Sequence, residues 1–263
     1  MNVPPFHWWR TVFFLIPAIS VYTIVLGTLS LGSALVDRRG LFAHRCARAW
    51  AWLILETTGV SVDIEGQEDL DASRSYLFLS NHQSIYDIPV LFWHLPLQLR
   101  IIAKDSLGSF PFLGWHLRRT GHVLVDRKSP GKSTLNQVAR LMRNRLSLLV
   151  FPEGTRSVDG RLQRFKAGTI LLAIDSQIPI VPVAVEGTRH VMRKGRLMTC
   201  PGHVRVRVHP AIETAGLDRS HARDVAERVE TAIRTDVDRW QSEPVSCRWP
   251  SPRRCPTSRR RRS

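Results

Sequence analysis

The sequence predicts an α/β domain with a mixed, largely parallel sheet flanked by helices, preceded by membrane helices. From Val60 onward, short apolar runs alternate with helical stretches, as in chains that form strands joined by helices. Before that point, the 26 residues from Thr11 to Val36 carry no charge. The chain of 263 residues can bury one sizeable core and need not be split into two.

The uncharged N-terminal stretch is long enough to cross a membrane. As a helix that rises 1.5 Å per residue it would extend ~39 Å, against about 30 Å for the bilayer core. A secretory signal is the alternative, but the apolar core of a signal is usually only about 7–15 residues long. More arginines follow the stretch than precede it. If the stretch spans, the main domain therefore lies on the cytoplasmic face.

A second helix is expected at Leu41–Leu55, with a basic opening and an apolar end that contains Trp50 and Trp52. Basic residues beside tryptophans are typical of a helix at the lipid headgroups, although an ordinary helix packed on the domain has the same pattern. The two helices could also form a hairpin that enters one leaflet without crossing. We assign residues 1–57 to membrane-embedded or interfacial helices.

The α/β domain is expected to occupy residues 58–243. Its strands are expected at Tyr76–Ser80, Leu97–Ala103, His122–Val125, Ser147–Phe151, Ile180–Glu186 and Val204–Val208. Its helices are expected at Pro89–His94, Pro130–Arg145, Lys166–Ser176 and His221–Arg239. The last segment, 244–263, has four prolines, seven arginines and no acidic residue, so it cannot build a core and is predicted to be disordered.

The charge indicates the kind of partner, and the cysteine usage indicates the cellular compartment. The net charge of +16 favours anionic partners, such as a membrane surface, a phosphorylated substrate or nucleic acid. The basic residues are not interleaved with aromatic ones in repeats, so a nucleic-acid platform is not expected. The four cysteines have no CxxC spacing, so we expect no metal site, no disulfide framework and a reducing compartment.

The strongest chemical signal is a histidine five residues before a carboxylate, His82 and Asp87, directly after the expected strand Tyr76–Ser80. Inside one helix, residues five apart point about 140° away from each other, so the two can meet only where the backbone bends. A strand-loop-helix junction supplies that bend. Asp87 would then fix the His82 tautomer and leave the other ring nitrogen as a base. A loop histidine and a helix cap remain the alternative.

Cations or glycine also follow three other expected strands. Lys104 follows the first, Arg127 the second and the segment Phe151–Arg156 (FPEGTR) the third. Strand ends carry ligand sites in α/β sheets, so these cations could converge on a phosphate. Arg156 is the best candidate because a guanidinium can hold two phosphate oxygens. Gly154 would allow a close approach to the backbone. Each residue alone could equally be an ordinary turn residue.

Together, four segments in order resemble the motifs of the 1-acylglycerol-3-phosphate (lysophosphatidic acid) acyltransferases. The likeness runs from about Tyr76 to Gly187. The motifs are NHx4D at residues 81–87, a second block from Lys104 to Arg127 that includes FPFLGW at 110–115, FPEGTR at 151–156 and IVPVAV at 180–185. The resemblance implies a glycerophosphate acyltransferase-like fold.

The resemblance also implies a role for each residue that matches a motif. His82 would be the general base on a lysophospholipid hydroxyl, and Asp87 would orient it. The glycerol phosphate and its backbone would be bound by Lys104, Arg127, Glu153, Gly154, Thr155 and Arg156. The co-substrate would be an acyl thioester, either acyl-CoA or an acylated acyl carrier protein, with no cofactor, no metal and no acyl-enzyme.

Two alternatives stay open at this point. The same chemistry could use another acceptor, such as a lyso-aminolipid, another lysophospholipid or glycerol 3-phosphate. A protein that only binds anionic lipid is an alternative of a different class. A non-catalytic homologue would be expected to lack His82 or Asp87, and this chain has both.

Overall fold

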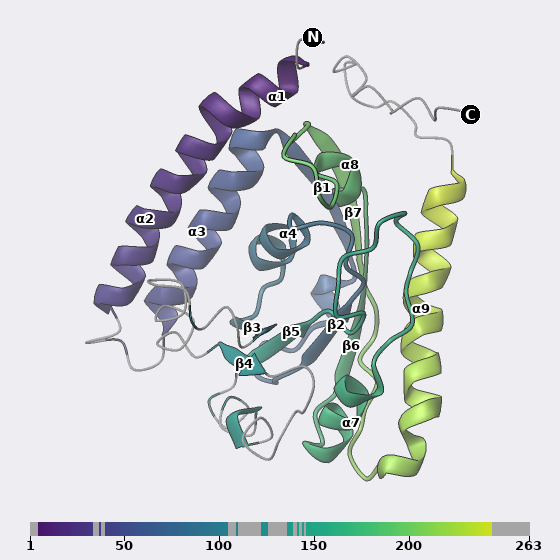
Figure 1. Ribbon diagram of the computed structural model, residues 1–263. Coiled ribbons are helices and arrows are strands. Elements are labelled where there is room, and N and C mark those ends of the chain that lie inside the picture. The colour runs from purple at the N-terminus through teal and green to yellow at the C-terminus, as the bar shows by residue number, and fades with distance from the viewer. Residues whose placement is uncertain are drawn as a thin grey trace.

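The computed structural model of the chain describes residues 5–33, 37, 40–104, 109, 122–125, 136–138, 141, 144 and 146–243 (Figure 1). Seven strands form one sheet in the order β1-β7-β6-β2-β5-β3-β4. All neighbouring pairs are parallel except β6 and β7. The prediction of a mixed, largely parallel sheet is confirmed. The strands are β1 (Val60–Glu65), β2 (Leu77–Ser80), β3 (Leu99–Lys104), β4 (Val123–Val125), β5 (Ser147–Val150), β6 (Ile180–Glu186) and β7 (Gly202–Val208).

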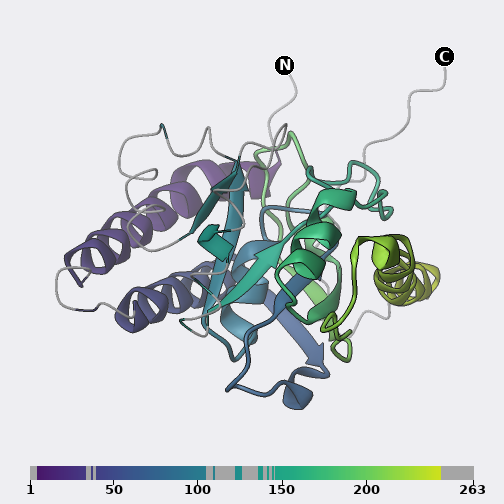
Figure 2. The same ribbon diagram turned by 90° about the horizontal axis from the view of Figure 1, so that it is seen from below.

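Helices cover both faces of this sheet (Figure 2). Leu77 and Leu79 of β2 point into a core shared with α7 (Ala167–Asp175) and α9 (Ala222–Ser242). Phe78 between them points into a core shared with α3 (Leu41–Thr58) and α4 (Asp87–His94). This alternation is the two-residue period of a strand buried on both sides. The helices of the domain are α4 (Asp87–His94), α7 (Ala167–Asp175), α8 (Thr188–Val191) and α9 (Ala222–Ser242), with short 3-10 turns at Gln67–Asp69 and Arg219–His221.

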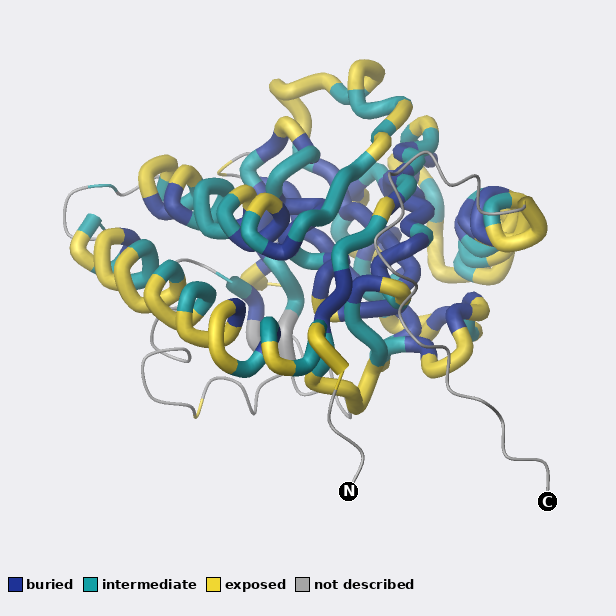
Figure 3. Tube along the Cα trace, turned by 90° about the horizontal axis from the view of Figure 1, so that it is seen from above, coloured by how far each residue is buried: buried dark blue, intermediate teal, exposed yellow. Residues whose placement is uncertain are grey.

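The N-terminal region consists of two helices that pack side by side (Figure 1). The first is continuous through α1 (Phe6–Arg10), a π-helical turn (Thr11–Leu15) and α2 (Ile16–Ser33). Its 28 residues are long and apolar enough to cross a membrane, and its outer side is exposed (Figure 3). The second helix, α3 (Leu41–Thr58), ends at Gly59, which adopts the left-handed conformation common after a helix.

The contacts of helix α3 bear on whether this helix lies at the lipid headgroups or packs on the domain. One of its faces is buried against the domain through Ala51, Ile54 and Leu55. The indole N–H of Trp50 donates to the Thr23 hydroxyl of α2 at 3.0 Å. Trp52, in contrast, is 42% exposed. The helix therefore packs on the domain and on α2, and it leaves a tryptophan on its outer face.

Most predicted elements lie within two residues of the observed ones, and β6 has the predicted bounds. Among the described residues, one strand and one α-helix were missed: the edge strand β1, whose polar and apolar residues alternate, and the four-residue helix α8. The helix predicted at 130–145 lies mostly outside the described residues, of which 136–138 and 141 are helical. The predicted tail, 244–263, lies outside them altogether.

The cysteines correct one expectation. Cys200 is disulfide-bonded, whereas no disulfide framework was expected from the cysteine spacing. Cys46 is buried and free. A disulfide requires two cysteines that are close in space and not close in sequence, so the lack of CxxC spacing did not exclude one.

Candidate active site

The junction between β2 and α4 places the predicted histidine and carboxylate. All four residues of β2 are buried, and the chain leaves the sheet after Ser80. The Asn81 side chain then pairs with both backbone groups of Val185 in the neighbouring strand β6. Its Nδ2 donates to the carbonyl of Val185 at 2.7 Å, and the N–H of Val185 donates to its Oδ1 at 2.8 Å. This side-chain pairing anchors the loop at the point where the strand ends.

The bend brings His82 and Asp87 together. Asp87 is the first residue of α4, and its Oδ2 lies 2.7 Å from Nδ1 of His82. The same oxygen accepts the backbone N–H groups of Gln83 at 2.8 Å and Ser84 at 3.0 Å. A carboxylate can only accept, so Nδ1 carries a proton, and in the neutral ring Nε2 then keeps its lone pair. Nothing in the described part of the chain hydrogen-bonds Nε2.

Residues that follow β5 contact the backbone and the ring of His82. Its backbone N–H donates to Oε1 of Glu153 at 2.6 Å, and its carbonyl accepts the N–H of Ser157 at 2.7 Å. Its ring stacks on Phe151 with the ring centroids 4.0 Å apart and the planes 16° from parallel. His82 is thus held through its backbone, through one face of its ring and through Nδ1. This is the preorganisation that a general base needs.

The segment Phe151–Arg156 follows β5, which lies beside β2 in the sheet. Gly154 has φ +73°, and a Cβ there would come within 2.6 Å of Nζ of Lys166. Nζ of Lys194 donates to the Thr155 hydroxyl and to the carbonyl of Arg156, both at 2.9 Å. Two cations from outside this segment, Lys166 and Lys194, thus lie against it, and the sequence did not predict them because no motif marks either residue.

Only part of the expected phosphate site can be located. Lys104 is the last residue of β3, and the strand register places its backbone at the same edge of the sheet as Asn81. The side chain of Lys104 and the whole of Arg127 lie outside the described residues. The structure therefore brings Glu153, Gly154, Thr155 and Arg156 next to His82 in one loop system. The convergence of three cations on one phosphate stays a prediction.

Glu153, which was expected to bind the glycerol backbone of the substrate, is buried in the protein. The residue is 5% exposed, and its carboxylate oxygens accept the backbone N–H of His82 and, at 3.2 Å, that of Gln163. Burial raises the pKa of Glu153 to about 7, and the nearby Asp87 and Asp159 add to the rise against the two hydrogen bonds. The geometry gives Glu153 a part in placing His82, whereas the glycerol contact implied for it stays a prediction.

This raised pKa predicts a pH-dependent stability. The folded state holds the Glu153 proton more tightly than the unfolded state, whose reference pKa is 4.5. The stabilisation is therefore complete below that value and is lost as the pH rises through about 7. Relative to Glu153→Gln, the wild-type free energy of unfolding should fall by on the order of 3 kcal/mol between pH 4 and pH 8. Denaturant unfolding of both proteins between pH 4 and pH 8 checks this. Free energies of unfolding that change equally with pH in the two proteins would contradict it.

Comparison with known proteins identifies the group of enzymes to which this site is related. The Acyltransferase family model matches residues 61–186. A 1-acyl-sn-glycerol-3-phosphate acyltransferase of Saccharomyces cerevisiae is 33% identical over 205 residues, which are 76% of this chain and 67% of that protein. The chain belongs to this acyltransferase family.

The chain is also similar to other members of the family. A 1-acyl-sn-glycerol-3-phosphate acyltransferase of Cocos nucifera is 32% identical over 194 residues, 73% of this chain and 61% of that protein. The crystal structure of the 1-acyl-sn-glycerophosphate (LPA) acyltransferase PlsC from Thermotoga maritima superimposes with a TM-score of 0.76 at 25% identity, covering 90% of this chain and 96% of that one. The chain spans about 60% of the length of the plant relatives that it matches.

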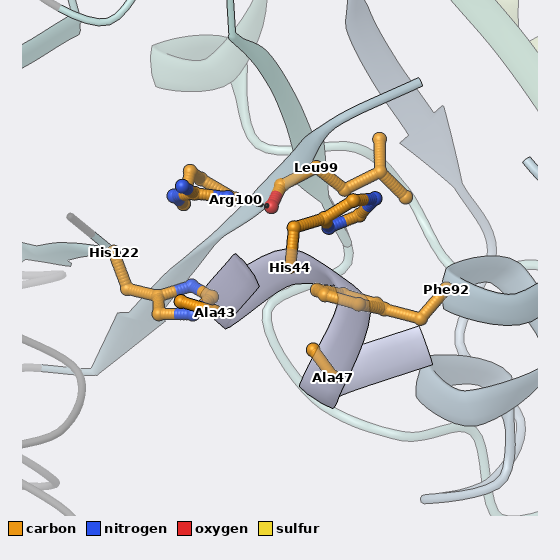
Figure 4. Close-up of a pocket in the computed structure, with 7 residues that line it drawn as sticks. All are labelled: Ala43, His44, Ala47, Phe92, Leu99, Arg100 and His122. Atoms are coloured by element: carbon orange, nitrogen blue, oxygen red, sulfur yellow. Dashed lines mark hydrogen bonds between the residues drawn. The ribbon is translucent and has the colours of Figure 1, made fainter. Parts of the chain in front are cut away.

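A small cavity in this family member lies apart from the predicted site (Figure 4). One of the residues that line it is Arg100, which is 4% exposed. Arg100 pairs in register with Leu148 and Leu148 with Leu77, so it lies level with the start of β2 and not with His82. Among the described residues, none of the predicted site residues lines the cavity, whose walls are Ala43, His44, Ala47, Phe92, Leu99, Arg100 and His122.

Proposed function

We propose that this protein transfers a fatty acyl group from an acyl thioester to the free hydroxyl of 1-acylglycerol 3-phosphate, forming phosphatidic acid. The observation that carries the proposal is the 2.7 Å hydrogen bond from Nδ1 of His82 to the fully buried Asp87. It leaves Nε2 as a proton acceptor beside the Phe151–Arg156 loop. Membership of the family, whose relatives bear the name of this activity, supports the choice of substrate.

The reaction needs a base because a lipid hydroxyl is a poor nucleophile at neutral pH. Nε2 of His82 would take the hydroxyl proton as the oxygen attacks the thioester carbonyl, and Asp87 would stabilise the imidazolium. Collapse of the tetrahedral intermediate breaks the carbon–sulfur bond, and the thiolate takes the proton back from His82. A positioned base typically contributes about 10²- to 10⁴-fold. The transfer is direct, with no acyl-enzyme and no cofactor.

The substrates are expected to arrive from the membrane and from solution. The exposed apolar helix Phe6–Ser33 would hold the domain at the lipid surface, where a lysophospholipid acceptor resides. If this helix spans the membrane, the arginines that follow it would place the domain on the cytoplasmic face. Arg156, with Lys104 and Arg127, would bind the phosphate of the acceptor. The donor would be acyl-CoA or an acylated acyl carrier protein.

The test is thiol release from acyl-CoA by the full-length protein in detergent, with and without 1-acylglycerol 3-phosphate. Release that depends on the acceptor, with phosphatidic acid detected by mass spectrometry, is the expected result. Parallel reactions contain acylated carrier protein as donor, or lysophosphatidylcholine or glycerol 3-phosphate as acceptor. If another acceptor is used at least as well, the assignment of the substrate is wrong. If no donor and acceptor pair reacts, the proposed activity is wrong.

A further inference from the structure

Asp87 has a fourth hydrogen-bond donor, which comes from a distant part of the chain. The hydroxyl of Thr188, the first residue of α8, donates to Oδ1 of Asp87 in a short hydrogen bond. Thr188 lies outside the IVPVAV motif and is fully buried, as is Asp87. The imidazole of His82 and the two loop N–H groups all use the other oxygen, Oδ2. Within the part of the chain that the structure describes, Thr188 is the sole donor to Oδ1.

This division of donors between two oxygens sets the orientation of the carboxylate. Donors on Oδ2 alone would leave Oδ1 buried without a partner, which costs the full desolvation of a charged oxygen. A half-turn about the Cβ–Cγ bond only exchanges two equivalent oxygens, but a smaller rotation would move the oxygen that faces Nδ1 away from His82. The Thr188 hydroxyl both satisfies Oδ1 and opposes that rotation. The hydrogen bond to Nδ1 therefore depends on a residue that does not touch His82.

The backbone around Thr188 is fixed at that location. Gly187 has φ +103°, and a Cβ there would lie 2.2 Å from the carbonyl oxygen of His203, so the turn out of β6 needs glycine. Beyond α8, the Ser84 hydroxyl donates to the carbonyl of Met192 at 2.7 Å. With the Asn81–Val185 pair, the segment that carries Thr188 is tied to the His82 loop on both sides.

We infer that Thr188 is a positioning residue for the His82–Asp87 pair, a role that rests on the proposed acyl transfer. Loss of the hydroxyl loosens the orientation of Asp87 and so the tautomer and direction of the His82 ring. Thr188 is fully buried, so we expect it to contact neither the acceptor nor the thioester. The defect should therefore appear in kcat and not in KM.

The experiment compares Thr188→Val, Thr188→Ser and a control, Thr214→Val, in the thiol-release assay. Thr214 is also fully buried, and its hydroxyl donates to the carbonyl of Ile178 at 2.8 Å, so its replacement removes a buried threonine hydrogen bond elsewhere. Thr188→Val should lower kcat about tenfold to 100-fold with both KM values within about twofold, as for loss of a hydrogen bond to a charged group. Thr188→Ser should recover most of the rate, and Thr214→Val should keep it.

A second readout keeps the inference testable without turnover. Imidazole ¹⁵N NMR of the full-length protein reports the tautomer of His82, assigned by comparison with His82→Asn. The wild type and Thr188→Ser should show the Nδ1–H form, and Thr188→Val a mixture of forms. Equal kcat in Thr188→Val and Thr214→Val, or an unchanged His82 signal, would overturn the inference. A wild type that is inactive with every acceptor would overturn the proposed function instead, and the NMR result would still decide the role of Thr188.

Discussion

His82→Ala should lower the acceptor-dependent kcat by about 10²- to 10⁴-fold, the contribution expected of a positioned general base. The imidazole is held by Asp87 at 2.7 Å and by stacking on Phe151, and Nε2 is the atom that would receive the proton of the acceptor. The backbone contacts of residue 82 with Glu153 and Ser157 do not need the ring, so the loop should keep its path. Acyl-CoA thiol release at saturating acceptor measures the effect.

A matched control is available on the far edge of the sheet. Nε2 of His203 lies 2.9 Å from a carboxylate oxygen of Asp63, so His203→Ala also removes a histidine–carboxylate pair. That pair joins β7 to β1 and is partly exposed, and the variant should keep wild-type kcat. If His82→Ala retained more than about a tenth of the wild-type rate, general-base catalysis by His82 would be refuted. A thermal unfolding midpoint close to wild type would exclude misfolding as the cause of a loss.

The sequence predicted the parts of the site that depend on local structure. His82 and Asp87 are five residues apart, and the strand end at Ser80 and the proline at position 89 mark a junction at which two such residues can meet. The same local signals predicted the bounds of β6 and the positions of most other strands. Such features follow from periodicity and turn chemistry, and they need no knowledge of the order of the strands.

The contacts that hold this pair in place could not be predicted in the same way. Glu153 is 71 positions from His82 and Thr188 is 101 positions from Asp87, so both contacts depend on β2 lying between β5 and β6. Hydrophobic pattern alone does not give that order. Strand β1 was missed for a related reason, because it pairs with one neighbour only and has no continuous apolar run.

Arg156→Ala should lower kcat/KM for 1-acylglycerol 3-phosphate about tenfold to 100-fold, mainly through KM, as for loss of a hydrogen-bonded charge that binds phosphate. Arg156 belongs to the loop that also places His82, and its carbonyl is fixed by Lys194, so its backbone should not move. Arg156→Lys should recover only part of the loss, because an ammonium cannot hold two phosphate oxygens in parallel. Steady-state kinetics with varied acceptor measures all three proteins.

The same variants should behave differently with an acceptor that lacks phosphate. Monoacylglycerol offers a free hydroxyl and an acyl chain but no charge, so Arg156→Ala should change its already slow reaction by less than about threefold. Arg161→Ala is the control for charge, because Arg161 is exposed and lies five residues further along the chain. It should leave both acceptors unaffected. An equal loss with both acceptors in Arg156→Ala would mean that Arg156 supports the loop and does not bind phosphate, and the phosphate site would then have to be sought among the other cations of this sheet edge.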